Sequence, residues 1–188
     1  MDAAITIRRI LKVNHAGEYG AIRIYGAQIA IARRFYPEIA GVLSDIRAHE
    51  IQHCRLFRHA MPYRGAHPCR VMAFWSLGGS VLGFVTGLMG QRMVWICTEA
   101  VESAVHRHLE EQLAFLDVRD PELKTLIASI QQEELSHLSE AQSRRGDAGP
   151  AQRGAVVLIG AVTDALIWLS TWGDSTRMAR EMRAAAGG

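Results

Sequence analysis

An internal repeat constrains the fold of this chain more than any other feature of its sequence. When the sequence is compared with itself at an offset of 84 residues, identical residues recur without a gap between positions 18–53 and 102–137. The identities include Glu18/Glu102, Arg23/Arg107, Gln28/Gln112, Ala30/Ala114, Pro37/Pro121, Glu38/Glu122, Glu50/Glu134 and His53/His137. Each unit has two helix-forming stretches separated by a proline, so each predicts a helical hairpin. Two similar hairpins pack naturally as a four-helix bundle.

The helices of this bundle can be placed from proline, glycine and composition. Stretches rich in Ala, Leu, Ile, Arg, Gln and Glu predict helices over about 4–33, 38–60, 91–117 and 121–143. Pro37 and Pro121 stand in the first turn of a helix, and Asp120 is a suitable N-cap for the fourth. A polar linker at 144–153 precedes an apolar helix at about 155–172, and the tail at 184–188 is expected to fray. We therefore predict one all-α domain over 1–188, with hairpins at about 4–60 and 91–143.

Composition excludes several classes of protein. Hydrophobic residues make up 49% and charged residues 21%, which argues against global disorder. Lys and Arg number 21 against 19 acids, so the net charge of +2 is too balanced for a dedicated nucleic-acid binder. Cys54, Cys69 and Cys97 form no Cys-x-x-Cys pair, which makes a disulfide scaffold or a zinc ribbon unexpected. The N-terminal segment has no apolar core and predicts no secretory signal.

The repeated polar residues have the chemistry of metal ligands. Glu50 and His53 are spaced i, i+3, so both side chains can face the interior of the bundle, and the second hairpin repeats the spacing. Together with one glutamate from each remaining helix, the predicted ligands are Glu18, Glu50, His53, Glu102, Glu134 and His137. Two divalent cations would neutralise the four buried carboxylates, with two glutamates bridging. Oxygen and nitrogen ligands without thiolates suit iron or manganese.

Some of these assignments have rivals. A single Glu-x-x-His is common on helices, and the matched second copy favours the metal interpretation over two solvated faces. Glu99 lies one turn before Glu102 on the same face, but the repeat register favours Glu102. Tyr25 lies two turns after Glu18, as a core residue or a hydrogen-bond partner of a ligand. The remaining histidines are expected at the surface or beside the ligands: His15, His49, His59, His67 and His108; His106 is left out of the ligand set.

Several of these segments resemble the Coq7/CLK-1 family, membrane-bound di-iron monooxygenases of ubiquinone biosynthesis. The matching segments are NHAGEYGAIRIYGAQ (14–28), HEIQH (49–53), CTEAVES (97–103) and QEELSH (132–137), within a resemblance that covers about residues 8–172. The resemblance implies a ferritin-like bundle that hydroxylates 5-demethoxyubiquinone. It makes the six predicted ligands iron ligands, with Glu50 and Glu134 bridging. It also implies two iron ions per chain, O2 as co-substrate and an external electron donor, NADH or a reductase.

One position departs from this resemblance. Leu109 stands where many members of the family have a tyrosine. If that tyrosine delivers electrons or protons, His108 and Tyr25 are the candidates to replace it.

Hypotheses from three classes follow. The leading hypothesis is an O2-dependent hydroxylase acting on a polyprenylated benzoquinone. The alternatives are a ferritin-like ferroxidase or peroxidase and a non-catalytic membrane-associated protein. The expected partners are the quinone, a membrane surface, and further copies of the chain or a ubiquinone-biosynthesis complex, without nucleic acid. The expected location is peripheral, on the cytoplasmic face of a bacterial cell membrane or on the mitochondrial inner membrane in a eukaryote.

The membrane interpretation depends on an uncharged stretch at 71–91, which is long enough to span a bilayer. A single crossing there would separate Glu50 and His53 from Glu102, although all three are predicted to reach one site. We therefore expect 71–91 to be an apolar crossover within one leaflet, interrupted at Gly78, Gly79, Gly83 and Gly87. The helix at 155–172 should join it, with Asp164 turned away from lipid. Four arginines flank the two segments and are expected to meet anionic headgroups: Arg70, Arg92, Arg153 and Arg177.

Overall fold

The computed structural model describes residues 2–147 and 149–186, with the side chains of residues 74, 75 and 186 left aside. The described residues form helices and connections, and contain no strand. The helices are α1 (Ala3–Phe35), α2 (Ala40–Ala60), α3 (Met72–Leu88), α4 (Gln91–Leu116), α5 (Pro121–Arg145), α6 (Pro150–Ser170) and α7 (Asp174–Ala186). Short 3-10 turns at Pro37–Ile39 and Pro62–Arg64 precede and follow α2. The predicted all-α class is confirmed.

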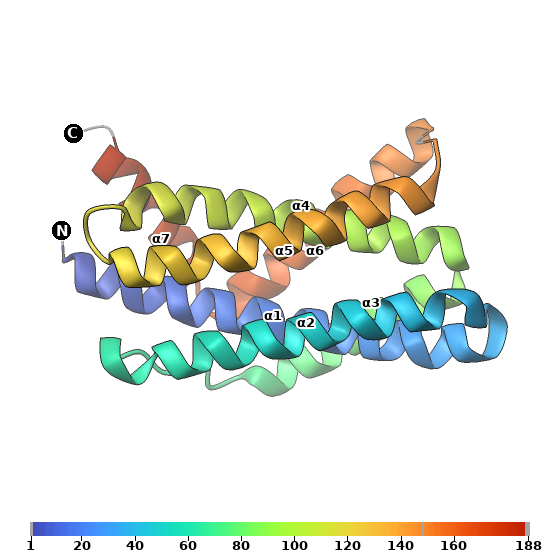
Figure 1. Ribbon diagram of the computed structural model, residues 1–188, viewed down its shortest axis with the longest axis horizontal. Coiled ribbons are helices and arrows are strands. Elements are labelled where there is room, and N and C mark those ends of the chain that lie inside the picture. The colour runs from blue at the N-terminus through green and yellow to red at the C-terminus, as the bar shows by residue number, and fades with distance from the viewer. Residues whose placement is uncertain (1, 148, 187–188) are drawn as a thin grey trace.

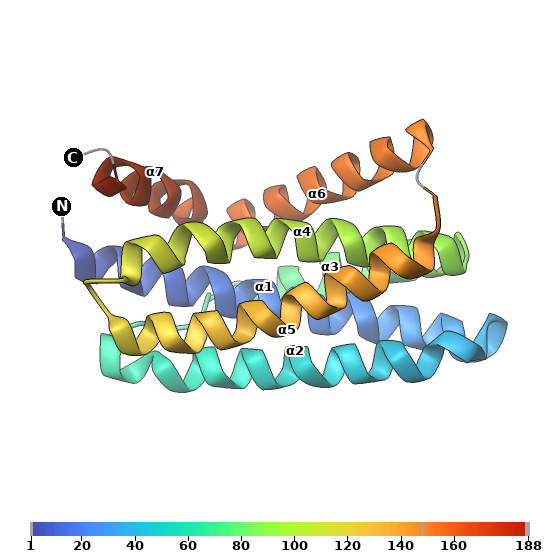
Figure 2. The same cartoon turned by 45° about the horizontal axis from the view of Figure 1, so that its top comes forward.

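Two hairpins, α1–α2 and α4–α5, form the predicted bundle (Figures 1 and 2). α2 and α4 run in the same direction because the connection after α2, together with α3, carries the chain back to the other end of the bundle (Figure 2). This is the ferritin-like arrangement with one long crossover. Both hairpin turns end at the prolines predicted for them, and the Asp120 side chain accepts a hydrogen bond from the backbone N–H of Leu123 as the N-cap of α5.

The crossover differs from its prediction in one respect: its glycines do not interrupt it. α3 is a continuous helix through Gly78, Gly79, Gly83 and Gly87, and it lies along α1. A Cβ added at Gly83 would lie 2.2 Å from the carbonyl oxygen of Ile24, and one added at Gly79 would lie 2.8 Å from the carbonyl oxygen of Gly20. The glycines therefore allow two helix backbones to approach closely, which is the physical role of small residues at four-residue spacing.

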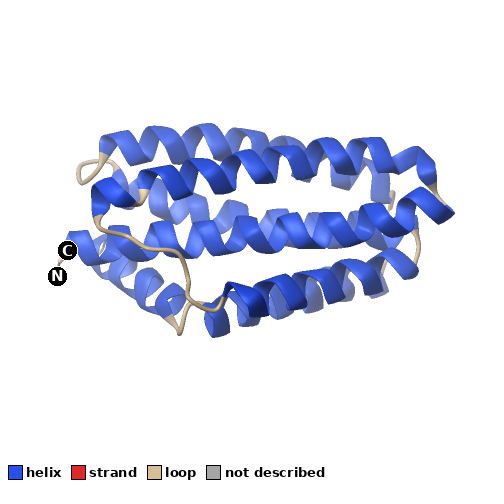
Figure 3. Ribbon diagram, turned by 90° about the horizontal axis from the view of Figure 1, so that it is seen from below, coloured by secondary structure: helices blue, strands red, loops and turns tan. Residues whose placement is uncertain are grey.

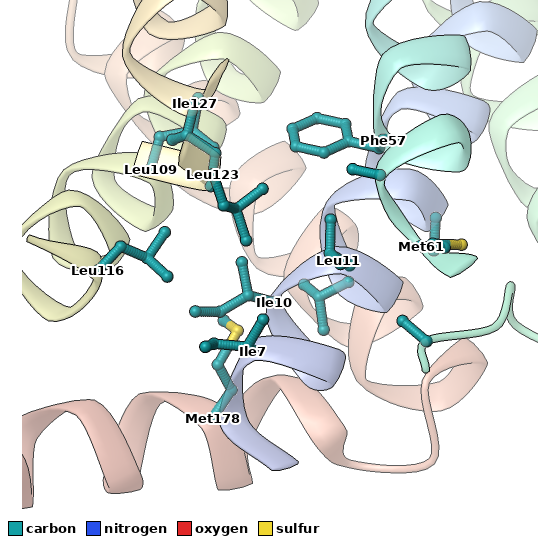
Figure 4. Packing of buried hydrophobic residues seen from close by; sticks show 14 of the residues in the cluster. Ile7, Ile10, Leu11, Phe57, Met61, Leu109, Leu116, Leu123, Ile127 and Met178 are labelled. Atoms are coloured by element: carbon teal, nitrogen blue, oxygen red, sulfur yellow. The ribbon is translucent and has the colours of Figure 1, made fainter. Parts of the chain in front are cut away.

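Apolar side chains fill the bundle at both ends and leave its middle to the polar repeat residues. At one end, α1, α2, α4, α5 and α7 contribute Ile10, Phe57, Leu109, Ile127 and Met178, as Figure 4 shows. At the other end, Tyr25, Leu43 and Trp95 pack in a second cluster. Glu18, Glu50, Glu102 and Glu134 lie in their helices between residues that belong to these two clusters.

α6 crosses the outer face of α4 and also contacts α3. The long helices of the bundle lie side by side, as Figure 3 shows. It begins at Pro150, five residues earlier than expected. Within the described part of the chain, α6 is the helix long and apolar enough to cross a membrane by length and composition, whereas α3 has 17 residues.

α7 was not expected from the sequence. Trp172 and Gly173 have φ values of 56° and 74° and turn the chain back toward the start of α1. Arg9 on α1 then pairs with both Asp174 and Glu181, and Met178 is fully buried in the bundle core. Of the tail predicted to fray, 184–186 complete α7, and 187–188 lie outside the described residues.

Candidate metal centre

The six predicted ligand side chains are all buried and meet in the middle of the bundle. None of them is more than 3% exposed. Helices α1 and α4 each supply one glutamate, and α2 and α5 each supply a Glu-x-x-His pair. The i, i+3 spacing places the glutamate and the histidine of each pair on the inward face of their helix, as expected from the pitch of an α-helix.

These side chains form two overlapping groups. The first group contains Glu18, Glu50, His53 and Glu134; the second group contains Glu50, Glu102, Glu134 and His137. Within each group, one potential ligand atom per residue lies within 4.8 Å of all the others. Glu50 and Glu134 belong to both groups, so each of them has the position that a bridging carboxylate requires.

Several ligand atoms in this cluster lie close to one another but form no hydrogen bond of acceptable geometry. They are Nδ1 of His53, Nδ1 of His137, Oε1 of Glu50 and both carboxylate oxygens of Glu134. Buried polar atoms without partners are costly, and in native proteins they call for an ion or another bound group. Their concentration at one point, on residues that all offer oxygen or nitrogen, fits a pair of divalent cations.

The electrostatics of the cluster also show an unneutralised site. Burial, followed by repulsion from Glu50 and Glu134, raises the pKa of Glu18 well above its usual range. Glu102 has a pKa raised by burial and by the same two neighbours. Burial opposes ionisation of Glu134 too, but the adjacent imidazoles of His137 and His53 outweigh it and lower the pKa of that carboxyl. Bound cations would favour the charged forms of these carboxyls and relieve their mutual repulsion.

The two histidines respond to the same carboxylates. Burial disfavours the charged form of His137, but the carboxylates of Glu134 and Glu50, each 3.4 Å from its Nδ1 atom, raise its pKa to about 9. His53 lies with its Nδ1 atom 2.8 Å from Oε1 of Glu134, and its pKa is also raised despite burial. Both histidines therefore direct Nδ1 into the cluster.

Tyr25 is a hydrogen-bond partner of the cluster. Its hydroxyl donates to Oε1 of Glu102 from a fully buried position. Burial and the negative charge of Glu102 raise the pKa of this tyrosine well above its usual value, so it remains a proton donor.

The outer nitrogens of the two histidines have different partners. His53 contacts Oε2 of Glu133 through Nε2 at 3.1 Å. His137 contacts Nδ1 of His49 through Nε2 at 2.9 Å, and the two rings are stacked with centroids 5.2 Å apart. Sequence reasoning did not select Glu133 and placed His49 only among surface or neighbouring histidines. The repeat contains a signal for both, since His49 aligns with Glu133 at the offset of 84.

Other polar residues near the cluster face elsewhere. Glu99, the rival of Glu102, pairs with Arg145 at 2.5 Å and belongs to neither group. His108 lies 3.5 Å from Asp164 on α6, and this contact does not bring it to the carboxylates. His106 contacts Gln131 at 3.4 Å. Tyr25, and not His108, is therefore the residue that contacts the cluster in the absence of an aromatic side chain at position 109.

Comparison with known proteins identifies the same family that the sequence resembles. A family model described as "Ubiquinone biosynthesis protein COQ7" matches residues 5–170. The chain is 33% identical over 168 residues, covering 87% of it and 76% of the relative, to a mouse protein named "NADPH-dependent 3-demethoxyubiquinone 3-hydroxylase, mitochondrial". It is 34% identical over 156 residues, covering 81% of it and 73% of the relative, to the "3-demethoxyubiquinol 3-hydroxylase" of Rhodospirillum rubrum. A protein of Dictyostelium discoideum with the same name as the mouse relative is 30% identical over 168 residues, 88% of this chain and 76% of the relative.

The family model covers both hairpins, the crossover helix and α6, and so includes every residue of the two groups. With this match and these relatives, the chain belongs to the COQ7 family of ubiquinone biosynthesis proteins.

Proposed function

We propose that this protein is a hydroxylase of ubiquinone biosynthesis that acts on the ring of 5-demethoxyubiquinone or its quinol. The observation that carries the proposal is the cluster of four buried glutamates and two histidines, with unpartnered ligand atoms, in a chain of the COQ7 family. The names of the mouse and Rhodospirillum rubrum relatives specify the same substrate class and the same type of reaction.

The cluster would hold two iron ions, one in each group, with Glu50 and Glu134 shared between them. When bound, such a pair would supply the redox chemistry that lets a protein use O2 as a co-substrate. The chain's own contribution is to fix the ligands. The outer contacts of His53 and His137 orient both imidazoles, and Tyr25 orients the carboxylate of Glu102. The apolar clusters on both sides keep water from the centre of the bundle.

The electron donor would be external, NADH or a reductase. The mouse and Dictyostelium discoideum relatives are named as NADPH-dependent, which favours a reduced nicotinamide as the ultimate source of electrons here too.

A groove of about 830 Å³ between α3 and α6 supports a long apolar substrate. Its walls include Val81 and Val85 of α3 and Leu166 of α6. Leu82 lines the groove and also packs against the cluster formed by Ile24 and Val101, the residues that precede Tyr25 and Glu102 in the chain. The isoprenoid tail of the quinone would lie in this groove while its ring lies toward the metal centre.

The same two helices would rest on the membrane surface. Large apolar side chains of α3 and α6 are exposed, among them Leu77 at 65% and Leu169 at 60%. Exposed apolar surface of this kind is typical of a lipid or protein contact. Since α3 packs along α1 and α6 against α4, the two helices would lie in one leaflet without crossing it. Reporter tags inserted after residues 62 and 92 should report the same face of the membrane, the cytoplasmic one in a bacterium; opposite faces would refute this placement.

A gene deletion in the host tests the activity. Loss of the protein should cause the demethoxy precursor to accumulate and ubiquinone to fall, and the wild-type gene should restore ubiquinone while Glu50→Ala should not. A normal ubiquinone pool in a deletion strain without a second hydroxylase would refute the function. Purified protein gives a second measurement: two irons and a co-purifying quinone support the proposal, whereas a large iron load indicates a ferroxidase or storage protein.

A further inference from the structure

The two groups of the metal centre differ in what lies behind their histidines. Nε2 of His53 faces the carboxylate of Glu133, whereas Nε2 of His137 faces the imidazole of His49. Both contacts connect α2 with α5. They are equivalent in the repeat, because His49 immediately precedes Glu50 and Glu133 immediately precedes Glu134. The pseudo-symmetric bundle thus places two chemically different acceptors in equivalent positions.

The difference has a defined effect on ligand strength. A histidine that binds a cation through Nδ1 carries its proton on Nε2 and donates it to the outer partner. A carboxylate acceptor pulls on this proton more strongly than an imidazole nitrogen does, because a hydrogen bond to a carboxylate is charge-assisted. The imidazole of His53 is therefore the more basic ligand, and basicity of this kind strengthens metal binding.

A second contact acts in the same direction. The hydroxyl of Tyr25 donates to Glu102, which belongs only to the second group, and so withdraws electron density from that ligand. The repeat equivalent of Tyr25 is Leu109, a buried side chain that has no proton to donate. Glu18 in the first group consequently lacks the corresponding hydrogen bond from α4.

We propose that the two groups bind divalent cations with unequal affinity: the first group binds first and more tightly, and Glu133 and His49 determine this order as positioning residues. The inference rests on the proposed metal centre. It adds the order in which the two groups bind cations and a difference in affinity between two groups that the repeat makes nearly equivalent.

The experiment is a titration of the full-length, metal-free protein in detergent with Mn²⁺, followed by electron paramagnetic resonance. Stepwise binding should give the spectrum of isolated Mn²⁺ up to about one equivalent per chain, and this signal should fall as the second ion couples to the first. Glu133→Gln keeps the size of the side chain and removes its charge, so it should weaken the first binding step about 10- to 100-fold. Glu140→Gln is the matched control, since Glu140 lies on the same helix with a similarly exposed side chain and pairs only with Arg144 in the contacts described for it.

His49→Glu provides the converse change. It should place a carboxylate behind His137, strengthen the second step and bring the two dissociation constants together. The group that binds first can be identified by removing one histidine at a time. His137→Ala should retain the tighter binding step, and His53→Ala should retain the weaker one. Circular dichroism of each metal-free variant checks that it is folded. If Glu133→Gln does not fold, His49→Glu alone tests whether the outer partners determine the order of binding.

The outcomes separate this inference from the proposed function. Failure of the wild-type protein to bind Mn²⁺ would overturn the metal centre itself. Binding of two ions with equal affinity, or a Glu133→Gln variant that matches Glu140→Gln, would overturn only the proposed order. A larger affinity in His53→Ala than in His137→Ala would reverse the assignment and refute the argument from the outer partners.

Discussion

Replacement of Gly83 by alanine tests how closely the crossover helix α3 lies against α1. The added Cβ would be 2.2 Å from the carbonyl oxygen of Ile24 and 2.8 Å from its Cα, and both obstacles belong to the backbone. An ordinary carbon contact begins near 3.4 Å, so the helices would have to separate by about 1 Å. Overpacking typically costs about 1–3 kcal/mol, and backbone obstacles place this substitution at the upper end.

The intrinsic helix propensity acts in the opposite direction. Alanine is favoured over glycine inside a helix by about 1 kcal/mol, which leaves a net destabilisation of about 2 kcal/mol for Gly83→Ala. Because 1 kcal/mol corresponds to about 2–4 °C in a protein of this size, the melting temperature should fall by about 4–8 °C. The hydrogen bond between Gln28 and Thr86, 3.0 Å long in the native structure, should also weaken as the helices separate.

Gly160→Ala on α6 is the matched control, because nothing lies within 4 Å of the Cβ that it would add. It should gain about 1 kcal/mol from propensity and melt about 2–4 °C higher than the wild type. Both variants are measured by thermal unfolding in the same detergent, followed by circular dichroism. A Gly83→Ala protein that melts as high as Gly160→Ala would show that α3 and α1 are not in backbone contact.

Further expectations concern the metal centre and the start of α5. Glu134→Ala should remove both metal ions, because its carboxylate belongs to both groups, whereas Glu99→Ala should retain them; elemental analysis of the purified proteins distinguishes the two results, and full metal content in Glu134→Ala would exclude a bridging role. Asp120→Ala should lower the free energy of unfolding by about 1–2 kcal/mol in denaturant titrations, because it removes the N-cap of α5 and leaves Arg64 without its main partner; an unchanged midpoint would contradict this. The Arg64 hydrogen bond lowers the pKa of Asp120, so its stabilising contribution should be fully present above about pH 4, the range of an unfolded aspartate, and should be lost as the pH falls through the folded-state value. Asp120→Asn should therefore approach wild-type stability in acid, and a difference that grows toward low pH would contradict the assignment.

The repeat made the bundle and its polar interior predictable because its residues carry both kinds of information. Proline and acid at the start of the second helix of each hairpin locate the turns, and Glu-x-x-His at the same offset identifies two helices that face each other. The repeat register separated Glu102 from Glu99 because the pseudo-symmetry relates individual positions: Glu102 aligns with Glu18, whereas Glu99 aligns with His15. The structure agrees, with Glu99 paired to Arg145 outside the cluster.

What could not be predicted depends on contacts between helices that are far apart in the sequence. Glycines at four-residue spacing predict either a break or a close helix contact, and only the neighbouring backbone of Ile24 decides between them. The contacts of His49 and Glu133 cross from α2 to α5 and require the relative height of the two helices. Met178 and Met182 already had the i, i+4 spacing of a buried face, but a helix as polar as α7 becomes recognisable only beside Arg9 and the bundle core.

Each group of the metal centre takes three side chains from one hairpin and one from the other. A free hairpin therefore could not complete either group; an ancestor with a single hairpin would have needed a second copy of itself, and would have lost its site on dilution. Fusion of the two copies makes the partner permanently available at a high effective concentration. It also frees each half to change without its twin, and the pairs Tyr25/Leu109 and His49/Glu133 are the places where the two copies have diverged around a ligand set that both still keep.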